Sequence, residues 1–354
     1  MSLTIGIIGL PQAGKTTLFS ALTRLDAGAA SASQKPNQAR VAVPDERLDK
    51  ASAIFTPKKT TPTAVDFLDV AATVTVEEKG SLGKRVLGSF RTVDALLMVA
   101  RAFDHPYLGA PRPRADLETL DLELVISDLS VIENTLERNR KMPTEARVWF
   151  EQVRDVLQEG RRPDPALIAS PPEAARPFAQ SMSLLVAKPT IVAANVGESA
   201  LGNEDADPAA QEARGWAEEH RREFFAVCAA IEQEISQLPP EEAQEFMSGL
   251  GIEKSGLDKL IVASYRSLDL ITFLTVGEDE CRCWTVHRGA TAPEAAGKIH
   301  SDLEKGFIRA EVVTSEDFLR LGTMAACRDK GVLRLEGRTY VVQDGDILNI
   351  RFNV

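Results

Sequence analysis

The chain has 354 residues, of which 44% are hydrophobic and 26% charged, and its formal net charge is −11 at pH 7. This length suits two or three domains, each with its own core. No apolar run approaches the roughly 18 residues of a membrane span, and the N-terminus enters a strand rather than a signal peptide. We therefore expect a cytoplasmic protein without membrane contact. The acidic charge argues against coating a polyanion, so we expect no DNA sequence recognition and only local nucleic-acid contacts.

The first expected element is a strand that leads into a glycine loop and a helix. Residues 4–17 read TIGIIGLPQAGKTT and fit GxxxxGK[ST] from Gly9 to Thr16 in its strand-loop-helix context. In this motif glycines let a phosphate chain lie against backbone N–H groups, Lys15 reaches the β- and γ-phosphates, and Thr16 binds Mg²⁺. The pattern predicts a nucleoside triphosphate site with Mg²⁺ as cofactor.

A polar stretch of small residues follows the predicted helix over residues 26–38. In a P-loop protein a loop at this place covers the γ-phosphate, and Ser33 is a candidate metal ligand. A plain surface loop explains the composition equally well. The next expected elements are a short strand at 39–43, a short helix at 46–55 and a basic, threonine-rich loop at 56–63.

Two buried strands are expected at 64–70 and 95–100, with a helix at 81–91 between them. The first strand ends in Asp69, where a Walker-B aspartate would hold Mg²⁺ through water, although a core strand that merely ends in an acid is the alternative. Apolar strands separated by helices predict a parallel sheet covered on both faces. The active site of such a sheet lies at the C-terminal ends of its strands, where Asp69 and the glycine loop both fall.

The middle of the chain has a different pattern. Apolar residues recur at three- and four-residue spacing over 122–136 and again over 146–157, which predicts two long antiparallel helices. The turn between them is either a solvated loop or a contact for an acidic or nucleic-acid surface. Its basic residues are Arg138, Arg140 and Lys141.

The sheet resumes with strands at 190–195 and 224–229. The first ends in Asn195-Val196-Gly-Glu198, at the place where a P-loop GTPase carries Asn-Lys-x-Asp to read guanine. The longer acid suits guanine poorly, whereas adenine offers a carboxylate only its N6 amine to accept from. The tetrad therefore favours ATP over GTP.

The last part of the chain predicts a small α+β module, with strands at 270–276, 281–286 and 347–352 and a helix at 293–304. The four cysteines lack the spacing of a zinc site or a disulfide framework. Two of them, Cys281 and Cys283, are most simply strand residues that face the same side, with redox sensing as the alternative.

Several longer motifs resemble one family. GLPQAGKTTLFSALT, the Asn-Val-Gly-Glu tetrad, VCAAIEQEI, WTVHRGATAPEAAGKIHSDLEKGFIRAEVV and VVQDGDILNIRFNV are similar to the YchF subfamily of Obg-like P-loop ATPases. The resemblance covers nearly the whole chain. It implies an α/β fold: a P-loop NTPase G-domain with a mostly parallel sheet, an inserted helical hairpin and a C-terminal TGS domain of β-grasp type. The implied bounds are 1–115 with 186–268 for the G-domain, 116–185 for the hairpin and 269–354 for the TGS domain.

The resemblance also implies slow hydrolysis of ATP, preferred over GTP, and association with ribosomes. The residues expected to act in hydrolysis are Lys15, Thr16 and Asp69. The residues expected at the phosphates are Gly9, Pro11, Gln12, Ala13, Gly14, Lys15, Thr16 and Thr17. The residues expected around the base are Asn195, Val196, Glu198, Cys228, Ala229 and Ala230.

The chain departs from the family pattern after Asp69. The family's Asp-x-x-Gly is replaced by a sequence with Ala72 in place of the glycine and Thr73 behind it, although the Ala72 amide could still donate to the γ-phosphate. A histidine that the family carries after its fourth strand has no clear counterpart. Three interpretations stay open: a slow ATPase switch that acts with the ribosome or another RNA-protein particle, a hydrolytically inactive nucleotide-binding adaptor, and a GTP-specific switch.

Overall fold

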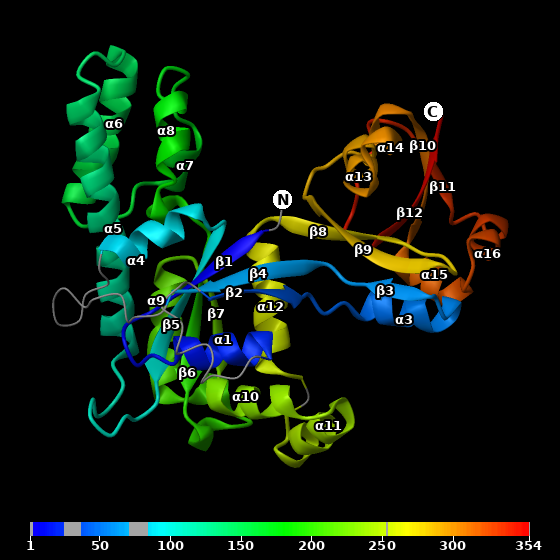
Figure 1. Ribbon diagram of the computed structural model, residues 1–354, viewed down its shortest axis with the longest axis horizontal. Helices are drawn as coiled ribbons and strands as arrows, with labels where there is room; N and C mark the ends of the chain where they lie inside the picture. Colours follow the sequence, from blue (N-terminus) through cyan, green and yellow to red (C-terminus); the bar gives the residue numbers. More distant parts are fainter. Residues whose placement is uncertain (1–2, 25–36, 71–83, 253, 354) are drawn as a thin grey trace. The chain divides into compact units, whose positions relative to one another are not determined.

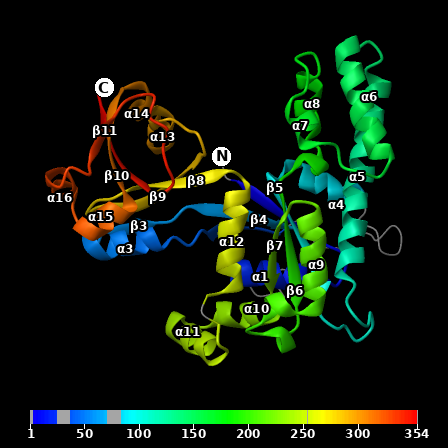
Figure 2. The same cartoon turned by 180° about the vertical axis from the view of Figure 1, so that it is seen from behind.

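The computed structural model describes residues 3–24, 37–70, 84–252 and 254–353 (Figures 1 and 2). It divides by its contacts into two compact units. The first unit comprises Met1–Val41 and Asp66–Leu260, and the second comprises Ala42–Val65 and Ile261–Val354. Within the described residues, each unit is built around a sheet of six strands.

The first sheet has the strand order β2-β4-β1-β5-β6-β7. Its strands are β1 (Thr4–Ile8), β2 (Asn37–Ala42), β4 (Ala64–Asp69), β5 (Ala95–Ala102), β6 (Thr190–Val196) and β7 (Glu223–Val227). The pairs β1–β4, β1–β5, β5–β6 and β6–β7 are parallel. Every residue of β5 is buried, as a strand of a parallel sheet with two covered faces requires. The predicted, mostly parallel sheet is confirmed.

Helices cover this sheet. Helix α1 (Lys15–Thr23) packs against α10 (Ala229–Gln237), whereas α9 (Pro208–Glu219) packs against β6 and β7. Helices α4 (Lys84–Ser89) and α11 (Pro240–Gly249) also belong to the first unit, and α12 (Gly256–Ser267) runs from the first unit into the second. None of the helices in the described part of the chain is both long enough and apolar enough to cross a bilayer.

The predicted helical hairpin is present as α5 (Pro113–Arg138) and α6 (Thr144–Gln158), which lie side by side (Figure 1). Two shorter helices follow, α7 (Pro165–Ala169) and α8 (Arg176–Met182). A buried carboxylate links α5 to the rest of the first unit, because Asp128 accepts hydrogen bonds from Arg91 Nη1 at 2.7 Å and from the Val186 N–H at 2.8 Å. The hairpin is thus anchored near its middle.

The second sheet has the strand order β11-β10-β12-β8-β9-β3. Its strands are β3 (Lys59–Thr61), β8 (Leu270–Thr275), β9 (Glu280–His287), β10 (Phe307–Thr314), β11 (Arg334–Glu336) and β12 (Asp346–Phe352). Its helices are α3 (Glu46–Phe55), α13 (Ala292–Ile299), α14 (Ser301–Lys305), α15 (Ser315–Leu321) and α16 (Met324–Asp329).

Both faces of this sheet carry a core. Successive residues of a strand point to opposite faces, and Phe273 belongs to one buried cluster whereas Leu274 belongs to the other. The first cluster includes three alanines of α13; the second includes Phe318 of α15 and Leu48 of α3. Cys281 and Cys283 lie together in the second cluster, as predicted for strand residues that face one side.

Residues 42–65 differ from their expected place. The sequence-based bounds put them in the nucleotide-binding domain, but their contacts belong to the second unit. Strand β3 pairs in parallel with β9, and Phe55 stacks on Phe318 with ring centroids 5.8 Å apart. The basic, threonine-rich segment predicted as a loop contains β3, an edge strand whose partner lies more than 200 residues further along the chain. The three-part division otherwise stays a prediction.

One predicted helix is wrong in extent. The pattern over 293–304 suggested a single helix, whereas α13 ends at Ile299 and α14 begins at Ser301. His300 between them has extended backbone, with φ −161° and ψ 143°, and its ring nitrogen accepts from the Asp302 N–H. A residue that caps the second helix through its side chain cannot also continue the first.

Candidate nucleotide-binding site

The glycine loop joins β1 to α1 in a conformation that depends on two glycines for different reasons. Gly14 has φ +85°, in the left-handed region, and directly precedes α1. Gly9 has no positive φ, but a Cβ on it would lie 2.6 Å from the Val99 carbonyl oxygen of β5. Gln12 also adopts a left-handed conformation, with φ +67°. Gly14 therefore supplies a left-handed backbone angle, whereas Gly9 is needed for close packing against β5.

Lys15, Thr16 and Asp69 form the charged part of the site. Lys15 is 9% exposed, and its Nζ donates to the Leu10 carbonyl oxygen at 2.9 Å. Burial lowers the pKa of Lys15, and the charge of Asp69 opposes that shift. Thr16 Oγ1 donates to Asp69 Oδ2 at 3.1 Å. The end of β4 thus meets the start of α1, as predicted from the C-terminal edge of a parallel sheet.

The second oxygen of Asp69 identifies a place for a cation. Asp69 is fully buried, and its Oδ1 has no hydrogen-bond partner among the described residues. Burial raises the pKa of Asp69, while the Thr16 hydroxyl and the Lys15 charge act against the rise. A buried carboxylate oxygen without a partner is unfavourable unless a cation or its bound water occupies the site.

The donor set fits Mg²⁺, which prefers oxygen ligands and keeps several waters. Thr16 would bind the ion through its hydroxyl and Asp69 through water; the bound ion would neutralise phosphate charge. Ser33, the other candidate ligand, lies outside the described residues, as do Ala72 and Thr73. Within the described ranges no group of three or more His, Cys, Asp or Glu side chains could hold a metal.

Asn195 connects two loops of the site. It is 4% exposed; its Nδ2 donates to the Ala13 carbonyl oxygen at 3.0 Å, and its Oδ1 accepts from the Ala229 N–H at 3.0 Å. A Cβ on Gly14 would lie 2.1 Å from Asn195 Nδ2. The side chain expected at the base therefore also holds the glycine loop against the start of α10.

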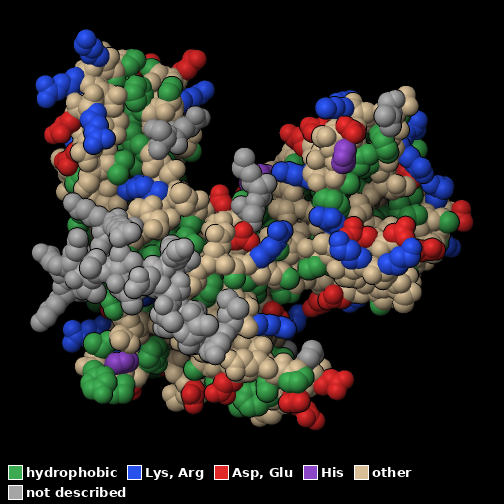
Figure 3. Space-filling model, in the orientation of Figure 1, with side chains coloured by type: hydrophobic (Ala, Val, Ile, Leu, Met, Phe, Trp, Pro, Cys, Tyr) green, Lys and Arg blue, Asp and Glu red, His purple; other side chains and the backbone are tan. Residues whose placement is uncertain are grey.

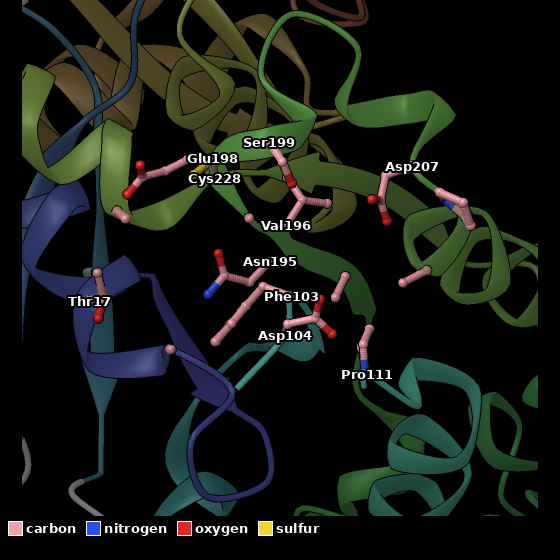
Figure 4. Close-up of a pocket in the computed structure, with 16 residues that line it drawn as sticks. Thr17, Phe103, Asp104, Pro111, Asn195, Val196, Glu198, Ser199, Asp207 and Cys228 are labelled. Carbon is pink, nitrogen blue, oxygen red and sulfur yellow. The ribbon is translucent and has the colours of Figure 1, made fainter. Parts of the chain in front are cut away.

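A pocket of about 570 Å³ opens beside Asn195 (Figure 4). Gly14 of the glycine loop and Thr17 of α1 line it together with Val196, the last residue of β6, and Glu198, which follows β6. Its lining also includes Asn195, Cys228 and Ala230. Of the other expected residues, Gly9, Pro11, Gln12, Ala13, Lys15, Thr16 and Ala229 are not part of its lining.

The side chains at the base end differ in character. Val196 is 2% exposed and apolar, whereas Glu198 is exposed at the start of a short 3-10 helix, Glu198–Ala200. Burial raises the pKa of the Cys228 thiol, so this side chain faces the pocket in its neutral form. The pocket thus combines an apolar wall with the exposed carboxylate of Glu198 at its base end.

Sequence reasoning missed one wall of this pocket. Phe103, Asp104 and Pro111, from the loop after β5, also line it. Arg101 holds that loop in place through hydrogen bonds from its guanidinium to the carbonyl oxygens of Phe103 at 2.7 Å, Gly109 at 2.9 Å and Ala110 at 3.0 Å. The loop after β5 could have been predicted as part of the site, because β5 is a neighbour of β1 and ends at the same edge of the sheet.

The strand-loop-helix geometry, the buried lysine and the Thr16–Asp69 contact define a P-loop nucleoside triphosphate-binding protein. A family model described as "50S ribosome-binding GTPase" matches residues 4–139. A second one, YchF-GTPase_C, described as "Protein of unknown function (DUF933)", matches residues 270–353.

Relatives that match over nearly the whole chain identify the family. The "Ribosome-binding ATPase YchF" of Bacillus subtilis is 42% identical over 100% of both chains, and that of Escherichia coli O157:H7 is 38% identical over 100% of both. The "Obg-like ATPase 1" of Oryza sativa is 34% identical over 99% of this chain and 92% of its own. The solved Schizosaccharomyces pombe YchF GTPase is 33% identical over 99% of this chain and 98% of its own, with a TM-score of 0.84. The chain belongs to the YchF family.

Proposed function

We propose that this chain is a Mg²⁺-dependent nucleotide switch that binds ATP in preference to GTP, hydrolyses it slowly and works in the cytoplasm with the ribosome. The observation that carries the proposal is the pocket in which Gly14 and Thr17 lie at the phosphate end and Val196 and Glu198 at the base end. The names of the relatives, ribosome-binding ATPases, support the same assignment.

The preference for ATP rests on Val196 and Glu198. Guanine offers two donors, its ring N–H and its exocyclic amine, and a short aspartate accepts from both. Adenine has no ring N–H at the equivalent position, so a longer carboxylate that reaches only the N6 amine suits it better. Val196 is buried and carries no lysine stem to pack over a guanine ring. Both residues disfavour GTP by removing interactions it would need.

The proposal of slow hydrolysis rests on the sequence that follows Asp69. Phosphoryl transfer at P-loops depends on positioning and charge stabilisation, and a water-positioning glutamine or an inserted arginine completes the fast sites. In this sequence neither a glutamine nor an arginine occurs in the 14 residues that follow Asp69. Sites that wait for a partner turn over on the order of 10⁻⁴ to 10⁻² per second.

Titration calorimetry with non-hydrolysable ATP and GTP analogues, followed by a turnover assay on the same protein, tests these statements. We expect tighter binding of the ATP analogue and turnover well below one per second. Equal or reversed affinities would refute the preference. Binding with no turnover, including in the presence of ribosomes, would select the inactive adaptor instead. Lys15→Ala is the control that should remove binding and turnover together.

The tip of the helical hairpin is one proposed contact with the ribosome. Arg138, Arg140 and Lys141 are exposed there, and basic side chains are visible at this end of the hairpin in Figure 3. The same residues border a hollow of about 600 Å³ that also includes Met142 and Phe178. A protein of net charge −11 must bind a polyanion through such local groups.

Sedimentation with purified ribosomes, at low and moderate salt and with or without a non-hydrolysable ATP analogue, tests the partner. We expect the wild type to pellet and an Arg138/Arg140/Lys141 triple-alanine variant to pellet less. The control removes three exposed lysines elsewhere: Lys50, Lys58 and Lys298. The hairpin contact is wrong if the tip variant and the control variant pellet equally.

A further inference from the structure

Strands β10 and β12 place two arginines directly opposite each other. Their antiparallel register pairs Arg309 with Arg351, and both side chains are exposed. Like charges at directly opposite positions destabilise a pair of strands. The pairing of these two arginines with each other therefore does not stabilise the sheet.

A buried carboxylate organises the arginines on this face. Glu311 is 7% exposed and lies two residues from Arg309 on β10, hence on the same side of the strand. It accepts hydrogen bonds from Arg351 Nη2 at 3.2 Å, from Arg328 Nη2 of α16 at 3.0 Å and from Asn349 Nδ2 at 2.8 Å. These bonds hold two guanidiniums beside each other while their outer N–H groups stay available.

The charges on this face are not balanced. Three arginines, Arg309, Arg328 and Arg351, surround one carboxylate, which leaves two positive charges in excess. Arg309 has no ion-pair or hydrogen-bond partner in the part of the chain that the structure describes. The side chains of Arg328 and Arg351 are 58% and 56% exposed. The face thus presents cationic groups to solvent despite the acidic chain as a whole.

The same side of the sheet is covered only in part. Val313 and Ile347, further along β10 and β12, are buried with Phe318 of α15 and Cys327 of α16. Toward Arg309 and Arg351 the side chains on this side of the sheet are exposed to solvent. Leu335 of β11, which pairs with Glu311, is 60% exposed. Basic side chains are visible in Figure 3 along the second unit near β11 and α16. This part of the sheet face is therefore exposed and cationic.

We propose that this arginine face, made of Arg309, Arg328 and Arg351 around Glu311, binds the phosphate backbone of RNA. Guanidinium groups match phosphate oxygens with paired hydrogen bonds, and arginines drawn from three elements suit a continuous row of phosphates. None of the described residues that make up this face is aromatic and able to stack on a base, so the face contacts the backbone without reading sequence. The choice of RNA over another anion rests on the proposed ribosomal function.

Fluorescence anisotropy with a labelled 20-nucleotide poly(U) tests the face on the full chain. Single-stranded binding weakens with salt by a slope of about 0.7 per phosphate contact, so two lost contacts reduce affinity about 25-fold at 0.1 M salt. We expect this loss, and a slope smaller by about 1.4, in Arg309→Ala/Arg351→Ala. Arg309→Ala alone disturbs no contact of Glu311 and should weaken binding about 5-fold.

The matched control is Arg288→Ala, which removes an exposed arginine that pairs with Asp269 beyond the end of β9. It should leave poly(U) affinity within about twofold of wild type, since it removes no phosphate contact. Unchanged affinity and slope in both Arg309 variants would overturn the proposal. So would tighter binding of a labelled 20-residue polyglutamate than of poly(U), because the face would then fit an acidic protein.

Ribosome sedimentation separates this proposal from the general function. If the wild type pellets and the double variant pellets equally, with equal poly(U) affinity, the arginine face is wrong and the ribosomal function stands. If the wild type stays in the supernatant while poly(U) binding depends on Arg309, the ribosomal function fails and the RNA-binding face stands.

Discussion

The contact between Gly14 and Asn195 predicts a strong coupling between two substitutions. An alanine at Gly14 would take φ +85°, which costs about 1–2 kcal/mol for a residue with a Cβ. Its Cβ would also lie 2.1 Å from Asn195 Nδ2, so the amide must move. Movement breaks the hydrogen bonds of Asn195 to Ala13 and Ala229, both 3.0 Å long.

The magnitudes follow from these contacts. Each hydrogen bond contributes about 1 kcal/mol, and a buried N–H or C=O left without a partner costs about 1–3 kcal/mol. Asn195→Ala should therefore destabilise the first unit by about 2–4 kcal/mol, and Gly14→Ala by about 3–6 kcal/mol, since it adds the backbone term. The double variant should also cost about 3–6 kcal/mol, because the bonds of Asn195 are lost only once.

Urea unfolding followed by the fluorescence of Trp149 and Trp216 measures these free energies for the first unit. All proteins carry Trp284→Phe, which silences the tryptophan of the second unit. Asn134→Ala, a change at an exposed asparagine of α5, is the control and should have an effect below about 1 kcal/mol. Additivity of the two substitutions within about 0.5 kcal/mol would show that the two residues are not in the contact described.

Three further outcomes are expected. Burial raises the pKa of Asp69, and Mg²⁺ needs the ionised carboxylate, so the Mg²⁺-dependent affinity for ATP should fall as pH drops through a midpoint above about 3.9, the ordinary aspartate value. In calorimetry the Asp69→Asn variant should bind ATP weakly and with an affinity that does not depend on pH. A flat wild-type profile would contradict this. In the ligand-free protein the raised pKa of Asp69 has the opposite pH dependence. Its contribution to folding stability is present at low pH and is lost as pH rises through the raised pKa. Replacing Glu198 by Asp together with Val196 by Lys should move the preference toward GTP by about 1–3 kcal/mol, measured by competition of the two nucleotides, and an unchanged ratio would refute the role of the tetrad. Phe318→Ala should destabilise the second unit by about 3–5 kcal/mol in thermal unfolding, while Phe352→Ala, at a side chain that is 43% exposed, should have a small effect; equal effects would contradict the packing on Leu48.

The local elements of the nucleotide site could be predicted from the sequence because their causes are local. The glycine loop lies between an apolar strand and a largely buried helix, and the residues that give it this form are adjacent in the chain. The same holds for the buried strand that ends in Asp69, whose contact with Thr16 follows from the common edge of parallel strands. Lys15, Thr16 and Asp69 could therefore be predicted from the sequence.

The roles of residues that depend on distant partners could not be predicted from the local sequence. Asn195 was expected at the base, but its hydrogen bonds to Ala13 and Ala229 arise only when β6, the glycine loop and α10 meet in space. The Phe103 wall depends on Arg101, which turns back onto its own loop. Nothing in the local sequence distinguishes that arginine from a surface residue.

The assignment of residues 42–65 to a unit is the clearest difference between the expectation from the sequence and the tertiary structure. Their composition predicts a helix and a loop, and both are consistent with a surface position in the nucleotide-binding domain. Their partners, β9 and Phe318, are more than 200 residues away, and nothing in the local sequence of residues 42–65 indicates which strand β3 pairs with. The sequence by itself therefore determined the phosphate site and the parallel sheet, whereas only the tertiary structure decided which unit these residues join, because burial of Leu48 and Phe55 requires a surface that another part of the chain supplies.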